Sequence, residues 1–169
     1  SSDAILCYNS TPEGKGVFLN ITGDATIASG SLIFGDQLGF PIGFGLGLGS
    51  SGSGAHGSYG FNKDGTIYGN ATSPTSLGSG GDNAAGGSAI RITANNITVS
   101  GTISMDGGDY LDSWSETGSG GSIWVYADII SGNGILRVEG GNTDGAFMGG
   151  GGRIRFDYDT NITYTGQIS

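Results

Sequence analysis

The sequence is poor in the residues that cross-link small domains or attract nucleic acids. It holds one cysteine, so no disulfide can close within the chain. Six Lys and Arg stand against 15 Asp and Glu, giving a formal net charge of −9. This balance excludes the phosphate attraction on which nucleic-acid binding depends, and it also disfavours anionic membranes. No apolar run reaches the ~20 residues of a membrane span, so we expect no membrane insertion.

Residues that favour α-helices are scarce as well. Lys, Glu and Gln together number seven, whereas 37 of the 169 residues are Gly, which weakens helices. Three prolines and the lack of a Gly-X-Y period exclude collagen. Apolar residues alternate with polar ones in short segments, which a disordered chain has no reason to maintain. We therefore expect one all-β domain over residues 1–169.

An internal repeat is the most informative feature. Residues 89–108 align without a gap on residues 122–141, at an offset of 33. Further copies lie at 153–169, with one inserted residue, and more loosely at 16–34. Repeats of this length are typical of solenoids, in which like units stack on one another.

Each unit reads as short strands with one buried face, separated by glycines at a corner. Gly101, Gly134 and Gly166 occupy this corner, where a positive φ would cost Gly nothing. Asn-Gly and Asp-Gly hairpin signals are sparse within a unit, which favours parallel over antiparallel pairing. The sequence predicts a right-handed parallel β-helix with Gly-rich loop insertions; the alternative is a β-sandwich or jelly roll.

The longest Gly-rich insertion covers residues 36–87. Within it, glycines alternate with large apolar residues over 43–49, which predicts a strand with bare backbone on one face. Such a strand needs a partner surface, and we expect self-assembly through the apolar residues here and near the C-terminus: Leu38, Phe40, Ile42, Phe44, Leu46, Leu48 and Ile168.

Three motifs occur in a fixed order along the chain. They are GSGGDNAAGGSAIRITANNITVSGTIS, GSGGSIWVYADIISGNGILRVEGG and GGGGRIRFDYDTNITYTGQIS. This series resembles the glycine-rich β-helix module that is repeated in very large secreted or surface proteins. The resemblance covers about residues 14–169 and implies a parallel β-helix with a structural or adhesive role, without catalytic residues. The apolar stretch 38–48 departs from the pattern.

Five Asn-x-Ser/Thr sequons occur, where chance would give roughly one. Their enrichment predicts N-linked glycans and an extracellular or cell-surface location. The alternative is that Asn and Thr are simply frequent in β-rich surfaces. The candidate positions are Asn9, Asn20, Asn70, Asn96 and Asn161.

Catalytic and metal-binding patterns are weak. The only histidine, His56, lies in a predicted loop without partners for a triad or a zinc site, so we expect it to line a pocket or to be exposed. Cys7 has three interpretations: a nucleophile, an intersubunit disulfide or, preferred, a small buried residue. The spacing of Asp106, Asp109 and Asp112 leaves a structural Ca²⁺ as a minor alternative to no cofactor.

Carbohydrate chemistry is the remaining enzymatic option. Asp157 and Asp159 share one face of a predicted strand, as a carboxylate pair would, but no opposing carboxylate or basic cluster accompanies them. Exposed aromatic residues could stack on sugars, although packing under loops is the commoner use. These residues are Tyr110, Trp114, Trp124 and Tyr126.

The sequence stops inside the strand pattern at its C-terminus, with no polar cap of the kind that ends a solenoid. We expect either that the chain is one module of a longer array or that a neighbouring subunit completes the end. The preferred function is a non-enzymatic subunit of a glycosylated extracellular filament, formed by head-to-tail stacking or by strand complementation involving residues 1–13 or the 38–48 stretch. The alternatives are a module of a surface adhesin that binds glycans and a carbohydrate-active enzyme.

Overall fold

The computed structural model describes residues 4–6, 15–63, 65–112 and 114–169, and nearly all their regular structure is β-strand. One short 3₁₀ helix, η1 (Phe61–Lys63), is the only helix in this part of the chain. The strands are β1 (Ala4–Leu6), β2 (Val17–Asn20), β3 (Ala25–Ile27), β4 (Leu32–Phe34), β5 (Ala89–Thr93), β6 (Asn96–Val99), β7 (Thr102–Ser104), β8 (Ser122–Gly132), β9 (Ile135–Arg137), β10 (Arg153–Tyr164) and β11 (Gln167–Ile168).

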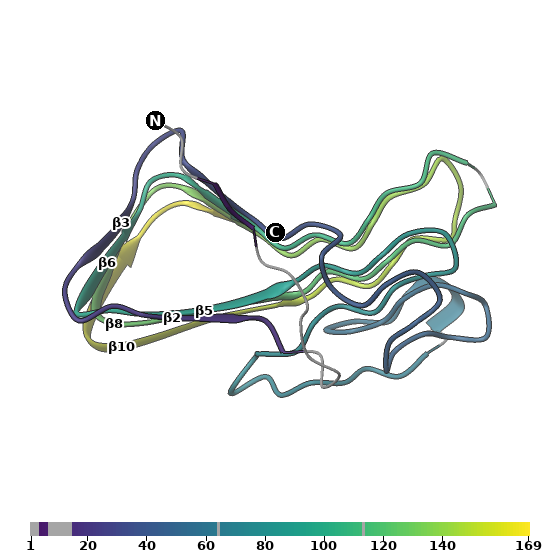
Figure 1. Cartoon of the computed structure of the whole chain (residues 1–169), viewed down its shortest axis with the longest axis horizontal. Helices are drawn as coiled ribbons and strands as arrows, with labels where there is room; N and C mark the ends of the chain where they lie inside the picture. Colours follow the sequence, from purple (N-terminus) through teal and green to yellow (C-terminus); the bar gives the residue numbers. More distant parts are fainter. Residues whose placement is uncertain (1–3, 7–14, 64, 113) are drawn as a thin grey trace.

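The strands form two sheets in which all pairings between them are parallel. One sheet has the order β2-β5-β8-β6-β3, and β10 is added on β8. The long β8 pairs with β5 through its first half and with β6 through its second, so this sheet curls into a half-barrel (Figure 1). The second sheet, β1-β4-β7-β9-β11, faces the curled sheet across the core.

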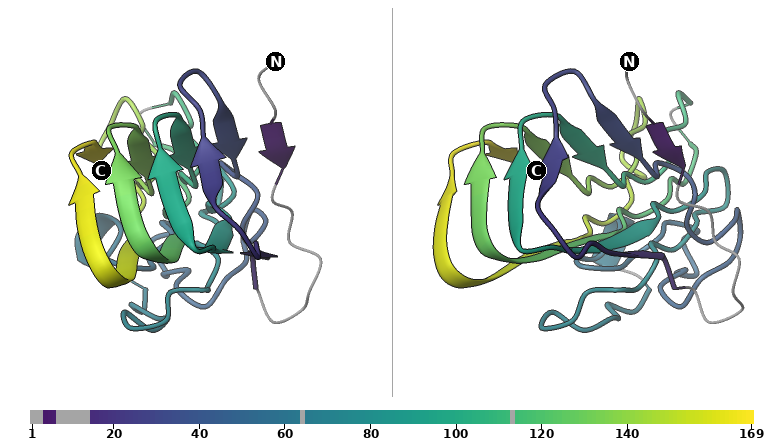
Figure 2. Two further views of the ribbon diagram at one scale, coloured as in Figure 1. Left: turned by 90° about the vertical axis from the view of Figure 1, so that its left-hand side faces the viewer. Right: turned by 60° about the vertical axis from the view of Figure 1, so that its left-hand side comes forward.

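The strands are stacked in four tiers along one axis, as Figure 2 shows. Tier 1 holds β2, β3 and β4; tier 2 holds β5, β6 and β7; tier 3 holds β8 and β9; tier 4 holds β10 and β11. The predicted 33-residue offset is confirmed by the pairing, because Ile90 lies beside Ile123 and Ile103 beside Leu136. Each repeat unit thus forms one tier.

The core lies between the two sheets and consists of the inward-facing apolar columns. Alternation along each strand sends every second side chain inward, and equivalent positions stack from tier to tier. Ile97 and Ile130, for example, are neighbours in one column and are fully buried. The buried cluster contains Ile27, Ile33, Ile90, Ile92, Ala94, Ile97, Val99, Ile103, Met105, Ile123, Val125, Ala127, Ile130, Leu136 and Val138.

The predicted fold class is wrong in the form stated above. The β-sandwich or jelly roll is overturned because those folds need antiparallel pairing. An all-β solenoid with loop insertions is not supported either: the strands make a curled half-barrel sheet and a second sheet, and one side of each tier carries no strands. Predominantly parallel strands suggest an α/β-type fold, although helices are almost absent from the described residues.

The physical reason for this difference is the glycine-rich part of each repeat. Residues 36–87 were expected to form a Gly-rich loop insertion. Instead the segments 78–81, 86–87 and 118–121 are buried and lie side by side in a glycine lobe, which is the right-hand part of Figure 1. Their backbones bond across segments, for example from Gly78 N to Gly87 O (2.8 Å) and from Gly120 N to Gly150 O (2.9 Å). Bare backbones therefore pack here without side chains while their polar groups remain paired.

The predicted strand over residues 43–49 is also wrong. Gly43 and Gly45 have φ values of 73° and 124°, which turn the chain instead of extending it. The turns are closed by hydrogen bonds from Phe44 N to Pro41 O (3.1 Å) and from Leu48 N to Gly45 O (3.3 Å). The alternation of glycine with apolar residues reflects turn geometry at these positions, and not the two faces of a strand.

The corner glycines are required for a different reason from the one expected. Gly101, Gly134 and Gly166 do not have positive φ. A Cβ at Gly134 would lie 2.1 Å from the Gly101 carbonyl oxygen, and one at Gly166 would lie 2.2 Å from that of Gly134. These corners therefore need glycine because the tiers approach closely at this point.

Candidate functional site

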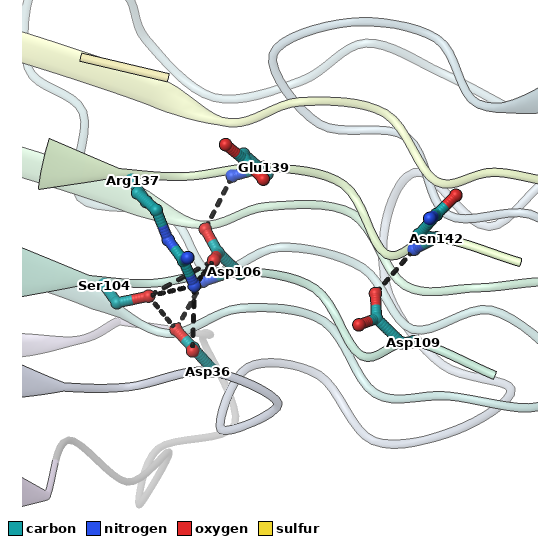
Figure 3. Close-up of polar contacts among 7 residues, drawn as sticks. All are labelled: Asp36, Ser104, Asp106, Asp109, Arg137, Glu139 and Asn142. Carbon is teal, nitrogen blue, oxygen red and sulfur yellow. Dashed lines mark hydrogen bonds and ion pairs between the residues drawn. The ribbon is translucent and has the colours of Figure 1, made fainter. Parts of the chain in front are cut away.

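A polar cavity of about 270 Å³ opens beside the turns that follow β4, β7 and β9. Asp36, Asp106 and Glu139 each follow their strand by the same two residues, so the stacking of β4, β7 and β9 brings these three carboxyl groups to this site (Figure 3). Gln37, Gly107, Asp109, Arg137, Gly140 and Asn142 complete the lining.

The carboxylates form a ladder along the stack. Asp36 Oδ1 accepts a hydrogen bond from Asp106 N (2.8 Å), and Asp106 Oδ1 accepts one from Glu139 N (2.7 Å). A second rung lies beside them, where Asp109 Oδ1 accepts from Asn142 N (2.6 Å). Asp36, Asp106 and Asp109 thereby fix the backbone of the next tier, which is a structural use of charge that the sequence pattern alone did not reveal.

Arg137 supplies the positive charge of this cavity. Its Nη2 lies 2.5 Å from Asp106 Oδ2 and 3.8 Å from Asp36 Oδ2, and it also donates to Ser104 Oγ (3.3 Å). The Ser104 hydroxyl donates in turn to Asp36 Oδ1 (2.6 Å). Burial raises the pKa of Asp106 above its ordinary value, against the lowering effect of its hydrogen bond from Glu139 N.

The lining of the polar cavity suits an uncharged polar ligand better than a metal ion. Arg137 offsets part of the carboxylate charge, and the cavity presents both donors and acceptors. Across the described residues, no group of three or more His, Cys, Asp or Glu is arranged to hold a metal ion. The three predicted calcium-loop residues have separate contacts: Asp106 binds Arg137, Asp109 binds Asn142 N, and the Asp112 carbonyl accepts from Thr143 Oγ1 (2.5 Å).

The two ends of the stack form a second candidate site. At the tier 1 end, a hollow of about 260 Å³ opens to solvent and is lined mainly by core side chains: Leu19, Ile21, Ala25, Thr26, Ile27, Ser31, Ile33 and Ile92. At the tier 4 end, Phe156 and Tyr164 pack against the core with ring centroids 5.4 Å apart and remain half-buried. Among the described residues, the apolar core is thus incompletely covered at both ends.

A column of outward-facing side chains runs along the curled sheet between these ends. In register order it consists of Phe18, Arg91, Trp124 and Arg155. The Arg91 guanidinium carbon lies 4.1 Å from the centre of the Trp124 ring, which is a cation–π contact. Aromatic and cationic side chains therefore alternate from tier to tier.

The predicted carboxylate pair lies next to this column and is already engaged. Asp157 accepts hydrogen bonds from Trp124 Nε1 (2.8 Å) and Arg155 Nε (2.7 Å), which hold the pKa of its carboxyl group below the ordinary value, Arg155 contributing most. Asp159 accepts from the Tyr126 hydroxyl (2.8 Å). Both carboxylates thus connect tier 4 to tier 3, and so do two of the predicted sugar-stacking aromatics.

His56 is fully buried in the glycine lobe, so the expectation of an exposed histidine is wrong. Its Nδ1 lies 2.9 Å from Gly120 O, and its ring packs on Tyr68 at a centroid distance of 4.8 Å. Burial lowers its pKa to about 4, so the ring is neutral at neutral pH and Nδ1 is the donor. The ring fills space between glycine backbones, which have no side chains to do so.

The predicted self-assembly residues fall into two groups. Leu38, Phe40 and Leu48 are half-buried in the glycine lobe, whereas Ile42, Phe44 and Leu46 are exposed. Ile168 is exposed on β11 at the tier 4 end, far along the chain from the others.

The sequon asparagines also differ in environment. Asn20, Asn70 and Asn161 are exposed. Asn96 is half-buried, and its Nδ2 donates to Asp24 Oδ1 (2.8 Å). Asn9 and Cys7 lie outside the described residues, as does most of segment 1–13.

Two exposed aromatics remain from the sequence prediction, Tyr110 and Trp114. Trp114 lies 5.9 Å from the ring of Phe147, which contacts Phe61 at 4.3 Å. Sequence reasoning missed Asp36 and Arg137 entirely. The alignment of Asp106 with Glu139 carried the signal for the carboxylate ladder, but Asp36 lay too close to the long glycine-rich segment to be aligned with them.

Comparisons with protein-family models, with curated proteins and with solved structures found no match. The resemblance to the glycine-rich module therefore stays a prediction. In the described residues, no helix has the length and apolar character needed to cross a bilayer.

Proposed function

We propose that this chain is a non-enzymatic structural subunit of a glycosylated extracellular filament, and that its subunits associate through the two ends of the stack. The observation that carries this proposal is that the described part of the chain covers the apolar core incompletely at both ends, with a hollow of about 260 Å³ at tier 1 and two half-buried rings at tier 4. Strand edges and core surface left open in this way are typical sites of pairing with another chain.

Head-to-tail association of two different ends is heterologous and does not close on itself unless a rotation forms a ring. One kind of contact, repeated, then gives an open filament. Exposed sequon asparagines at positions 20, 70 and 161 support the glycosylated and extracellular parts of the proposal.

A second candidate is a glycan-binding module of a surface adhesin. The polar cavity beside Asp36, Asp106 and Asn142 favours it, because donors and acceptors converge there in a space suited to a hydroxyl-rich ligand. In that case the open ends would be covered by preceding and following modules of one long chain.

Light scattering and electron microscopy of the purified 169-residue chain over a concentration series test the proposal. We expect filaments above a critical concentration. A monodisperse monomer at millimolar concentration would overturn the filament proposal, and glycan-array binding abolished by Asn142→Ala and Asp109→Ala would then favour the adhesin module.

A paired variant tests the surface predicted from the sequence. Phe44→Ser with Leu46→Ser replaces two exposed side chains of the glycine lobe, and Ile168→Ser replaces one at the tier 4 end. Loss of filaments in the first variant alone would assign assembly to the 38–48 stretch, whereas loss in the second alone would assign it to the stack end.

A further inference from the structure

Two inward columns have apolar side chains at both ends of the stack. Leu19 at tier 1 and Phe156 at tier 4 end one inward column, and Ala25 and Ile162 end another. Both ends of each column are therefore apolar. The tier 1 end carries the hollow and small Ala25, whereas the tier 4 end carries the aromatic pair of Phe156 and Tyr164.

The outward column matches as well. It begins with Phe18 at tier 1, continues with Arg91 and Trp124, and ends with Arg155 at tier 4. Phe18 is 46% exposed, although its ring is apolar. A second copy added in register beyond tier 4 would place its Phe18 beside Arg155, which continues the alternation of aromatic and cation seen between Arg91 and Trp124.

The backbone edges are compatible with this addition. Among the described residues, no strand pairs with the outer edges of β2, β3 or β10. The long β10 pairs with β8, and β8 pairs with both β5 and β6. Since β2 pairs with β5 and β3 with β6, β10 spans the length that β2 and β3 cover together. Only a strand running in the same direction continues a parallel ladder, and β2 and β3 of a second copy meet this condition.

The second sheet adds a constraint. β1 already pairs with β4, where Ile5 lies beside Ile33, and β11 lies at the far end of the same column, where Ile168 pairs with Leu136. In an in-register stack, β11 of one copy and β1 of the next would therefore compete for the same edge of β4. One edge accepts one strand, so β1 has to leave before the second sheet can continue.

We propose that the β2–β3 end of one copy docks in register on β10 of a second copy, that its Phe18 packs on Arg155 of the second copy, and that β11 of the second copy displaces β1 from β4. This inference rests on the proposed filament function and specifies its contact. It also means that β1 opposes assembly, because in each copy β1 occupies the edge of β4 on which β11 of a neighbouring copy would pair.

Disulfide trapping tests the register. One outward column runs from Thr26 through Thr98 and Ser131 to Thr163. Thr26 and Thr163, at its two ends, are exposed. Thr26→Cys with Thr163→Cys, made together with Cys7→Ser, should give a covalent ladder of oligomers on oxidation, because neighbouring strand positions meet disulfide geometry. Thr26→Cys with Thr165→Cys shifts one partner by two residues and should not. Asn161→Gln is run beside them, because Thr163→Cys also removes that sequon.

Filaments without a cross-link in the Thr26/Thr163 pair would overturn the register while leaving the filament function intact. Absence of wild-type filaments at any concentration would instead overturn the proposed function. An antiparallel, end-to-end dimer of two tier 1 ends would be visible as cross-linking of the single Thr26→Cys variant, and it would also overturn the docking proposed.

Charge substitution at Phe18 tests the contact with Arg155. Phe18→Lys places two cations side by side and should raise the critical concentration about tenfold, whereas Phe18→Glu restores attraction and should stay within a few-fold of wild type. Equal effects of the two variants would show that Arg155 does not face this position.

Deletion of residues 1–6 tests the competition. It should lower the critical concentration and shorten the lag before assembly, because the edge of β4 becomes free. Loss of assembly on deletion would show that β1 is required by the neighbouring copy, and would overturn its role as a competitor.

Discussion

The Nδ1 atom of His56 lies 2.9 Å from the carbonyl oxygen of Gly120, inside a lobe built of glycine-rich backbone. The imidazole bonds to backbone on this side, and its other nitrogen, Nε2, has no hydrogen-bond partner among the described residues. A neutral ring tolerates this position, whereas an imidazolium would bring an unpaired buried charge.

The stability of the fold should therefore depend on pH through His56. Burial first, and the nearby Arg153 charge as well, lower its pKa from 6.5 to about 4 against the raising effect of the Gly120 carbonyl. Between these two values the unfolded chain binds the extra proton and the folded chain does not. The free energy of unfolding should thus fall as pH drops from 6.5 to 4, by up to about 3 kcal/mol.

Urea denaturation at pH 7, 5.5 and 4 measures this loss, with His56→Asn as the control. The variant cannot titrate at this position, so its stability should change less over the same range. The prediction fails if the wild type and the variant lose equal stability on acidification.

Gly121 should tolerate no side chain. A Cβ at this position would lie 1.6 Å from the Ser88 carbonyl oxygen, which belongs to the backbone of the neighbouring tier and cannot rotate away. We expect Gly121→Ala to lower the free energy of unfolding by about 3 kcal/mol or more. Gly151→Ala is the matched control, because its nearest atom would be Ser58 Oγ at 3.7 Å. Thermal denaturation of both proteins measures the difference, and equal melting temperatures would contradict the tight approach of backbones in the glycine lobe.

Ile130 and Ile129 are sequence neighbours with opposite roles. Ile130 is fully buried between Ile97 and Ile162, whereas Ile129 is 38% exposed. Ile130→Ala should cost about 2–5 kcal/mol of unfolding free energy through lost burial and a cavity, and Ile129→Ala less than about 1 kcal/mol. Chemical denaturation of the two variants measures this. A larger loss for Ile129→Ala would mean that β8 has the opposite face toward the core.

Arg137 should matter most where the carboxylates around it are ionised. Arg137→Gln leaves Asp36 and Asp106 close to one another without a cation, and protonation of Asp106, whose pKa is raised by burial, relieves that repulsion. The variant should therefore lose more stability, relative to wild type, at pH 7 than at pH 4. Arg137→Lys keeps the charge and should lose less. Denaturation at the two pH values checks the sign, and a loss that does not change with pH would mean that Arg137 acts through packing alone.

The repeat is the part of this fold that the sequence determined. Alternation of apolar and polar residues set the inward face of each strand, and the offset of 33 placed Ile90 beside Ile123 and Ile103 beside Leu136, as the structure has them. These features are local or periodic, so one sequence is enough to read them. The alignment of Asp106 with Glu139 belongs to the same class, although its consequence, a carboxylate bonded to the next tier, was not foreseen.

Tertiary structure alone decided how the glycines are used. A glycine that needs positive φ and one that lies against another backbone look the same in a sequence, so Gly43 and Gly134 could not be told apart before the packing was known. The same holds for His56, whose burial depends on which segments of the glycine lobe meet around it. The size and polarity of a side chain indicate in the sequence what it packs against, whereas glycine has no side chain to give such an indication. The fold was therefore predictable where side chains pack, and was mispredicted where backbones pack on one another.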